Sequence, residues 1–139
     1  MNPTAPPAAA HPYPLFPRAA PQAQPVVRVR HTDLVDFVTA VFTARGLAPG
    51  RAREAARALC YGDLTGMTSH GLTNLTRLYL PLFDRGRVDP LAEPCVLADR
   101  GASVLLDARQ ALGLWAAGLA VDLAADRAAT YGVGMVSVR

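Results

Sequence analysis

Eight of the twelve prolines in this chain lie within its first 28 residues, and this uneven distribution limits which part of the sequence can fold. Proline fixes φ and removes a backbone hydrogen-bond donor, and the segment contains few side chains from which a core could be built. The segment also lacks the continuous apolar region of a secretory signal peptide. We therefore predict that residues 1–29 form a disordered, Pro/Ala-rich arm and that ordered structure begins near Arg30.

Hydrophobic periodicity predicts two helices in the segment that follows the arm. Apolar side chains recur at helical spacing after Thr32, which is a suitable N-cap, and Gly46 is expected to end this first helix. Pro49 is a suitable first residue for the second helix, whose stripe of small side chains implies close packing against a neighbour. The predicted inward-facing residues are Leu34, Phe37, Val38, Val41 and Phe42 in the first helix and Ala52, Ala55, Ala56, Leu59 and Cys60 in the second.

A third helix is predicted to begin at Thr68 or Ser69. Pro81 should force a kink or an end near Leu80, because proline inside a helix costs about 3 kcal/mol. The apolar face of this helix consists of Leu72, Leu75, Tyr79, Leu82 and Phe83. At roughly 100° per residue, three polar side chains fall together on the opposite side, and we call them the polar trio: His70, Asn74 and Arg77. Periodicity alone favours solvent as the environment of this polar face.

The pattern changes after residue 90 and predicts a sheet with one long helix. Short apolar runs on either side of a turn signal at residues 99–101 indicate a β-hairpin. Residues 111–131 indicate a long helix and residues 133–138 a buried strand, and this order predicts a crossover to a parallel strand pair. The residues of the long helix that are expected to face inward are Leu112, Trp115, Ala116, Leu119 and Leu123.

We therefore expect an α/β protein with a helical N-terminal subdomain at residues 30–90 and a β-hairpin, helix and strand at residues 91–139. A sheet of about three strands is smaller than the usual four to six. Ligand sites in α/β sheets lie just beyond the carboxyl ends of the strands, and the chain stops at Arg139, immediately after a strand. We accordingly expect the second part to be the beginning of a larger, truncated domain.

The charge and cysteine content exclude several function classes. All 14 basic residues are arginine and are scattered, whereas nucleic-acid-binding proteins cluster such residues, so we expect no nucleic-acid partner. The two cysteines, Cys60 and Cys95, form neither a disulfide framework nor a metal-binding motif, which fits a cytoplasmic protein without a metal site. The longest apolar run, residues 110–121, is shorter than the roughly 20 residues of a membrane helix, so we expect no membrane association.

His70 is the candidate catalytic residue that the sequence offers without comparison to other proteins. In the first turn of a helix it would lie beside the positive end of the helix dipole, which favours a neutral imidazole and allows acid–base chemistry near neutral pH. Ser69 does not by itself form a hydrolase pair with it, because adjacent helical side chains point roughly 100° apart. Asp63 could orient His70 if the loop between them folds back. No glycine-rich phosphate loop follows a strand, so the cofactor-binding residues stay unassigned.

The segment YGDLTGMTSHGLTNLTRLYLPLFDRGRVDP, residues 61–90, resembles the malate/L-lactate dehydrogenase family. This is the non-Rossmann type that includes ureidoglycolate, 2,3-diketogulonate and piperideine-2-carboxylate oxidoreductases. The first helix pair and the final GVGMVSVR extend the resemblance to residues 30–139. The positions that carry it are Asp63, Gly66, Ser69, His70, Gly71, Asn74, Arg77, Tyr79, Gly86, Asp89 and Pro90.

The resemblance implies an NAD- or NADP-dependent oxidoreductase that transfers a hydride between the nicotinamide and a small 2-oxo or 2-hydroxy acid, or a cyclic imino acid. His70 would transfer the proton to or from the substrate, and Ser69 would assist it. The family often has an arginine for the substrate carboxylate where Asn74 stands, so Asn74 and the nearby Arg77 are the expected substrate-binding residues.

The resemblance also implies a homodimer and makes residues 91–139 the first part of a cofactor-binding domain. A second active-site histidine and most cofactor contacts would lie beyond Arg139, so we expect the isolated chain to be inactive. A hypothesis from another class is a catalytically inactive, truncated homologue that acts as an oligomerisation or interaction module. An incomplete sheet would leave an edge strand and an apolar face uncovered, and both favour association.

Overall fold

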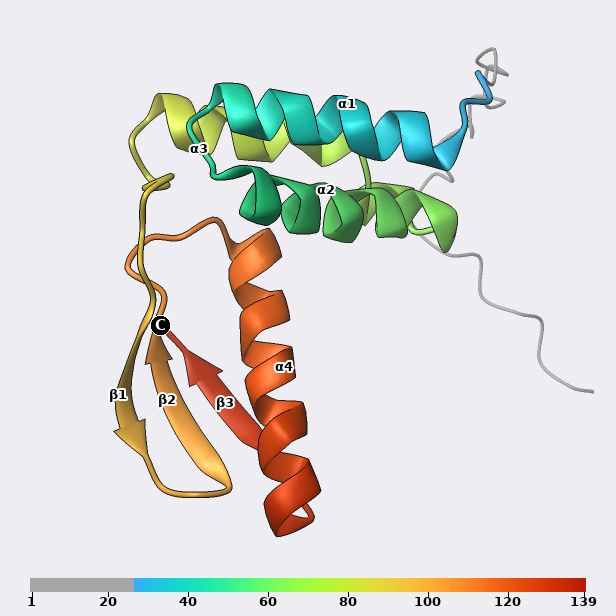
Figure 1. The fold of residues 1–139 in the computed structure, drawn as a ribbon. Coiled ribbons are helices and arrows are strands. Elements are labelled where there is room, and N and C mark those ends of the chain that lie inside the picture. Colours follow the sequence, from blue (N-terminus) through green and yellow to red (C-terminus); the bar gives the residue numbers. More distant parts are fainter. Residues whose placement is uncertain (1–26) are drawn as a thin grey trace, which may run out of the picture.

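A computed structural model of the chain describes residues 27–139, so the predicted arm lies outside the described residues except for residues 27–29. Figure 1 shows a layer of helices and, beside it, a small sheet with one helix packed along it. This combination confirms the predicted α/β class. The elements are α1 (His31–Ala44), α2 (Pro49–Leu64), the 3-10 turn η1 (Thr68–His70), the π-helical turn η2 (Leu75–Tyr79), α3 (Leu80–Asp84), β1 (Cys95–Asp99), β2 (Ser103–Asp107), α4 (Gly113–Tyr131) and β3 (Met135–Val138).

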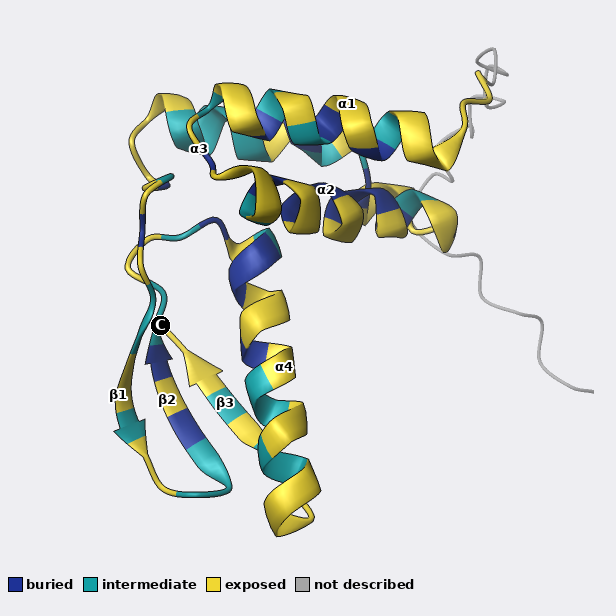
Figure 2. Cartoon of the chain, viewed as in Figure 1, coloured by how far each residue is buried: buried dark blue, intermediate teal, exposed yellow. Residues whose placement is uncertain are grey.

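The helices α1 and α2 pack against each other and form most of the core, as the dark-blue parts of their inner faces in Figure 2 show. The small side chains of α2 allow this close approach, and Ala52, Ala55 and Ala56 are completely buried. Leu59 and Cys60 are also completely buried. The whole predicted stripe of α2 is therefore confirmed.

The predicted inner face of α1 is correct except at one position. Val38 and Phe42 are completely buried, as predicted, whereas Phe37 is 59% exposed. Val35 takes its place in the core with 3% exposure. The apolar stripe of α1 is broad enough for either edge to face inward, and the side on which α2 packs selects the edge that contains Val35.

The sheet has the order β1-β2-β3, with β2 in the centre. Strands β1 and β2 form the predicted antiparallel hairpin, with an irregular register between Val96 and Ala98. Strands β2 and β3 are parallel and are connected by α4, which confirms the predicted crossover. The buried side chains of the sheet belong to the central strand, at Val104 and Leu106.

Two predictions for this part of the chain are wrong. The strand β3 is predicted to be buried, yet Met135 is 56% exposed and Val138 is 46% exposed. It lies at the edge of the sheet, and α4 packs along only one side of the strands, as Figure 1 shows. Leu119 is predicted to face inward but is 41% exposed. A sheet of three short strands offers too little surface to cover every apolar position of α4.

One buried cluster extends from α1 through α2 to the beginning of α4. Leu112 and Trp115 join it from the C-terminal part of the chain, with 1% and 4% exposure. The segment that carries the polar trio lies beside α2 and contributes Leu75 to the same cluster. The division of the chain into domains at residue 90 stays a prediction.

Candidate active site

The segment that carries His70 is not one continuous helix, in contrast to the prediction. The turn η1 ends at His70, and Gly71 then adopts an extended backbone with φ −97° and ψ −152°. A helix resumes at Thr73. Gly71 separates the two helical segments, and the Asp63 carboxylate occupies the space that the Cβ of any other residue would need at this position. His70 therefore lacks the long helix whose dipole the prediction invoked.

The next turn of this segment is the π-helical η2, where the prediction has a continuous α-helix. Leu80 donates its backbone N–H to the carbonyl oxygen of Leu75, which is the five-residue spacing of a π-turn. Pro81 follows and has no N–H to give to the Arg77 carbonyl, as an α-helix would require. The helix does not end near Leu80, one of the two predicted outcomes, because α3 follows η2 directly, and the predicted kink stays a prediction. The break at Gly71 and this wider turn together mean that the polar trio does not share one helical face.

Residues 69–72 form a compact turn, which we call the histidine turn. Within it, Ser69 Oγ lies 3.0 Å from His70 Nδ1, although helical geometry predicts that the two side chains point apart. The helix is interrupted directly after His70, so the two side chains are not held in the diverging directions of a continuous helix. Both residues are exposed. Since no residue in the described part of the chain hydrogen-bonds to His70 Nε2, this nitrogen is available to exchange a proton with a ligand.

Asn74 is bonded to the histidine turn. Its Nδ2 donates a hydrogen bond to the carbonyl oxygen of Ser69 at 2.8 Å. The residue is half-buried, at the beginning of the resumed helix. The amide group of Asn74, an expected substrate contact, is therefore already bonded to the main chain directly before His70.

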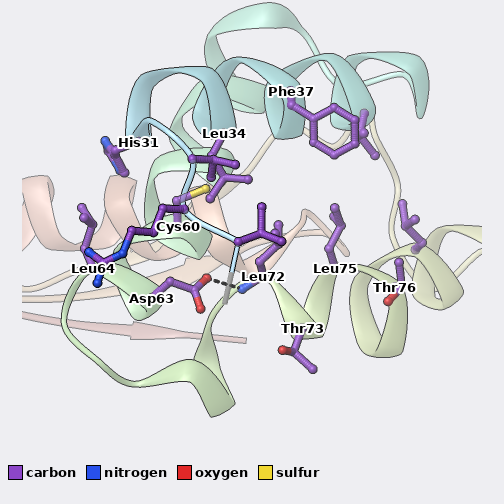
Figure 3. Close-up of a pocket in the computed structure, with 15 residues that line it drawn as sticks. His31, Leu34, Phe37, Cys60, Asp63, Leu64, Leu72, Thr73, Leu75 and Thr76 are labelled. Atoms are coloured by element: carbon purple, nitrogen blue, oxygen red, sulfur yellow. Dashed lines mark hydrogen bonds between the residues drawn. The ribbon is translucent and has the colours of Figure 1, made fainter. Parts of the chain in front are cut away.

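Asp63 also contacts the histidine turn, because the loop that follows α2 folds back. Its Oδ2 accepts a hydrogen bond from the backbone N–H of Leu72 at 2.6 Å, drawn as a dashed line in Figure 3. The preceding residue, Gly62, lies equally close: a Cβ at this position would be only 2.7 Å from the carbonyl oxygen of His70. The C-terminal end of α2 therefore packs directly on the main chain of the histidine turn, and Asp63 bonds to that main chain and not to the imidazole.

Arg77, the other expected substrate-binding residue, lies in η2 and is exposed. The ion pairs within residues 27–139 do not include it. Its guanidinium is therefore available to an anionic ligand, and an arginine can hold a carboxylate with two parallel hydrogen bonds.

A groove with a volume of about 1010 Å³ adjoins the histidine turn. Figure 3 shows it between α1 and the helix that follows the turn, with Phe37, Leu34 and Leu75 among its largely apolar wall. Asp63 belongs both to this wall and to the contacts of the histidine turn, but His70 does not line the groove. Sequence reasoning missed the groove because it assigned Phe37 to the core.

Cys60 also lines the groove, and its thiol is completely buried. Burial raises the pKa of this thiol above its ordinary value, and the nearby Asp63 carboxylate raises it further. A thiol that is buried and disfavours its thiolate is a poor nucleophile, and the burial itself agrees with the inward-facing position predicted for Cys60.

The described residues contain neither a candidate metal site nor a candidate membrane-spanning helix. Within residues 27–139, no three His, Cys, Asp or Glu side chains are grouped closely enough to hold a metal ion. Over the same range, every helix is too short or too polar to cross a membrane.

Comparison with known proteins matches this chain to dehydrogenases and reductases, both by sequence and by structure. The profile of the family described as malate/L-lactate dehydrogenase matches residues 29–139. The 2,3-diketo-L-gulonate reductase of Citrobacter koseri is 29% identical over 113 residues, which cover 81% of this chain and 34% of the reductase. The chain thus spans about a third of the length of the curated relatives that it matches.

Solved structures of two oxidoreductases superpose on the chain. The malate dehydrogenase of Entamoeba histolytica aligns with a TM-score of 0.77 and 26% identity, over 81% of this chain and 31% of its own. The delta1-piperideine-2-carboxylate reductase of Pseudomonas syringae aligns with a TM-score of 0.73 and 28% identity, over 82% of this chain and 34% of its own. The fold of most of this chain is therefore similar to about one third of each of these enzymes.

Proposed function

Because this chain belongs to the malate/L-lactate dehydrogenase family, we propose that it forms the N-terminal portion of a nicotinamide-dependent oxidoreductase that acts on a small 2-oxo or 2-hydroxy acid. The observation that carries the proposal is the exposed His70, whose Nδ1 is paired with Ser69 Oγ and whose Nε2 is free to reach a ligand. The relatives that share this region include reductases of oxo acids and of a cyclic imine.

His70 supplies the proton in this scheme. In the reductive direction, the substrate carbon gains a hydride, its carbonyl oxygen gains negative charge, and His70 Nε2 gives a proton to that oxygen. In the oxidative direction, neutral Nε2 accepts the proton of the 2-hydroxyl group. The Ser69 hydroxyl orients the ring through Nδ1, and it can accept from a protonated Nδ1 or donate to an unprotonated one, so it is compatible with both directions.

The described residues fit the proton-transfer side of this chemistry and leave the cofactor side unassigned. A bound NADH or NADPH supplies the hydride. No glycine-rich turn in the sequence follows a strand in the manner of a dinucleotide-binding loop, so no residue of this chain is assigned to the cofactor, and the choice between NAD and NADP is open. The free guanidinium of Arg77 is proposed to hold the substrate carboxylate, because the amide of Asn74 is bonded to the Ser69 carbonyl.

A chimeric enzyme tests the proposal. Residues 29–139 replace the aligned third of the Citrobacter koseri reductase, and oxidation of NADH and NADPH is measured with a panel of 2-oxo acids. We expect His70→Ala to lower kcat by about 10²- to 10⁴-fold, the usual contribution of a general acid. The matched control is His31→Ala, since His31 is the other described histidine and lies at the start of α1. An unchanged kcat in the folded His70→Ala chimera would refute the proposal.

A second candidate function, an oligomerisation or interaction module, is supported by the apolar surface that the fold leaves uncovered. Phe37 and Leu64 on the groove are 59% and 61% exposed, and Met135 on the edge strand β3 is 56% exposed. Groups of this kind favour association with a second copy or a homologue. Sedimentation velocity of the purified chain tests this candidate, and a monomer at all concentrations would count against it. The homodimer and the cytoplasmic location stay proposals as well.

A further inference from the structure

We infer that Asp63 and Asn74 are positioning residues for His70, which act on the main chain of the histidine turn from its two ends and do not touch the imidazole. The inference rests on the proposed role of His70 in proton transfer and deepens it. It assigns to Asn74 a function other than binding the substrate carboxylate. It also assigns to Gly62 and Gly71 the function of admitting the contacts that hold the turn.

Two hydrogen bonds bracket His70 along the chain. On its N-terminal side, Asn74 Nδ2 donates to the Ser69 carbonyl at 2.8 Å. On its C-terminal side, Asp63 Oδ2 accepts from the Leu72 N–H at 2.6 Å. His70 therefore lies between two main-chain groups, the Ser69 carbonyl and the Leu72 N–H, and each of them is hydrogen-bonded to a side chain.

These two bonds reach the turn from separate elements. Asp63 belongs to the last turn of α2, whose inner face is anchored in the core by completely buried residues. Asn74 belongs to the helix that follows the histidine turn and contributes Leu75 to the same core. The turn is thus fixed relative to two packed helices, although the His70 side chain itself is exposed.

The absence of side chains at two glycines makes this arrangement possible. The Cβ of any residue at position 71 would collide with the Asp63 carboxylate, and a Cβ at position 62 would lie 2.7 Å from the carbonyl oxygen of His70. Real Cβ atoms essentially never approach a backbone oxygen so closely, so a substitution at position 62 would force the turn away from α2. A substitution at position 71 would instead displace the Asp63 carboxylate from its bond to the Leu72 N–H. The two glycines and Asp63 are needed at these positions for one shared reason, which is the close approach of α2 to the turn.

The consequence for catalysis is geometric. A general acid works only within hydrogen-bond reach of the atom that it protonates, and a displacement of about 1 Å can cost 10²-fold in rate. The hydrogen bond between Ser69 Oγ and His70 Nδ1 can orient the ring only if the main chain of both residues is itself fixed. Loss of either of the hydrogen bonds made by Asp63 and Asn74 would let the turn move, and the imidazole ring would then sample several orientations.

The test is a spectroscopic one on the 139-residue chain itself. Ring ¹⁵N shifts of His70 report its tautomer and its hydrogen bond to Ser69, and the Leu72 amide proton shift and exchange rate report the bond to Asp63. The variants are Asp63→Ala, Asp63→Asn, Asn74→Ala and Asn74→Asp. Asp63→Asn keeps an acceptor oxygen, whereas Asn74→Asp keeps the shape but removes the donor. The control is Asp126→Asn, an exposed aspartate of α4.

In Asp63→Ala we expect exchange of the Leu72 amide to accelerate at least about tenfold and the amide proton to shift upfield, because its charged acceptor is gone. We expect the His70 ring shifts to move toward those of an unrestrained imidazole in Asp63→Ala and in both Asn74 variants. Asp63→Asn should restore most of the wild-type spectrum, and Asp126→Asn should leave it unchanged.

Unchanged His70 ring shifts in the folded Asn74→Asp variant and in whichever alanine variants fold, judged by circular dichroism, would overturn the inference. A full loss of the Leu72 amide signature in Asp63→Asn, with no effect on His70, would also overturn it. This outcome is separate from failure of the proposed function. That failure appears as unchanged turnover of the His70→Ala chimera, and it would leave the spectra of the turn as they are.

Discussion

The Arg51 guanidinium lies 4.4 Å from the centre of the Trp115 ring, and this contact joins α2 to α4. The same guanidinium donates to the Ala92 carbonyl at 2.9 Å and to Glu93 Oε2 at 2.7 Å. Trp115 is 4% exposed, so the cation stacks on a ring that is largely removed from water. One arginine therefore connects the helical layer, the loop before β1 and the helix that packs on the sheet.

Replacement of Arg51 by alanine is expected to destabilise the fold by about 1–2 kcal/mol, because it removes a cation–π contact and two hydrogen bonds at a half-buried position. Arg51→Lys should recover only part of this loss, since lysine lacks the planar guanidinium that stacks and bonds at once. Urea unfolding followed by circular dichroism measures the change.

The control for Arg51 is Arg53→Ala in the same helix. Arg53 is half exposed and pairs with the exposed Asp36, so its loss should cost less than about 0.5 kcal/mol. Equal destabilisation by the two alanine variants would contradict the role given to the Trp115 contact.

Gly62→Ala is expected to destabilise the chain by about 1–3 kcal/mol, the range of overpacked substitutions. Helix propensity alone favours alanine over glycine, but the new Cβ would lie 2.7 Å from the His70 carbonyl oxygen. The matched control is Gly50→Ala in the same helix, where nothing lies within 4 Å of the added Cβ. This control should be neutral or stabilising by up to about 1 kcal/mol. Denaturant unfolding of both variants decides the matter, and a stabilising Gly62→Ala would show that α2 does not press on the histidine turn.

The two cysteines should differ in reactivity. Burial, and then the charge of Asp63, raises the pKa of the Cys60 thiol above its ordinary value of 9.0, whereas Cys95 is partly exposed. At pH 8, we expect Cys60 to react with a thiol reagent at least about tenfold more slowly than Cys95. The variants Cys60→Ser and Cys95→Ser assign the fast and slow phases, and equal rates would contradict the burial of Cys60.

The raised pKa of Cys60 also predicts how the free energy of unfolding changes with pH. Its native pKa lies above the unfolded one, so the stabilising contribution is complete below pH 9 and is lost as pH rises through the native value. The free energy of unfolding should therefore fall more steeply above pH 9 in the wild-type chain than in Cys60→Ala.

Asp107 gives the opposite pH dependence. A hydrogen bond from the Arg109 backbone N–H, and then the side chain of Arg139, hold the pKa of this carboxyl below its ordinary value of 3.8. Its contribution is present above that value and is lost as pH falls through the lower native value. We expect Asp107→Asn to flatten the decline of unfolding free energy between neutral pH and about pH 3. Asp122→Asn, an exposed residue of α4, is the control, and identical slopes for all three proteins would refute the expectation.

Asn74 and Arg77 should separate kinetically in the chimeric enzyme. If Asn74 positions His70, Asn74→Ala lowers kcat and leaves KM for the 2-oxo acid nearly unchanged. If Arg77 binds the substrate carboxylate, Arg77→Ala raises KM at least about tenfold, as the loss of a charged hydrogen-bonding partner does. Steady-state kinetics with both variants provides the test. A raised KM in Asn74→Ala with unchanged kcat would show that Asn74 binds the substrate and does not position His70.

Features that depend on short stretches of chain could be predicted from the sequence. The alanine stripe of α2 follows from helical spacing alone, and every residue of it is buried. The hairpin and the crossover through α4 follow from turn residues and element order. Family membership follows from the spacing of motif residues around His70, which is a property of the sequence itself.

What only the tertiary structure decided concerns contacts between residues that are distant along the chain. Phe37 and Met135 have side chains apolar enough for a core, but no helix or strand within residues 27–139 covers them. Residues 68–83 carry a helical pattern, but the helix is interrupted at Gly71, where Gly62 and Asp63 of α2 pack against the turn that holds His70. Periodicity indicates which side chains are able to pack together. The neighbouring element determines which of them do pack, and the regular helical backbone is interrupted where that element comes close to it.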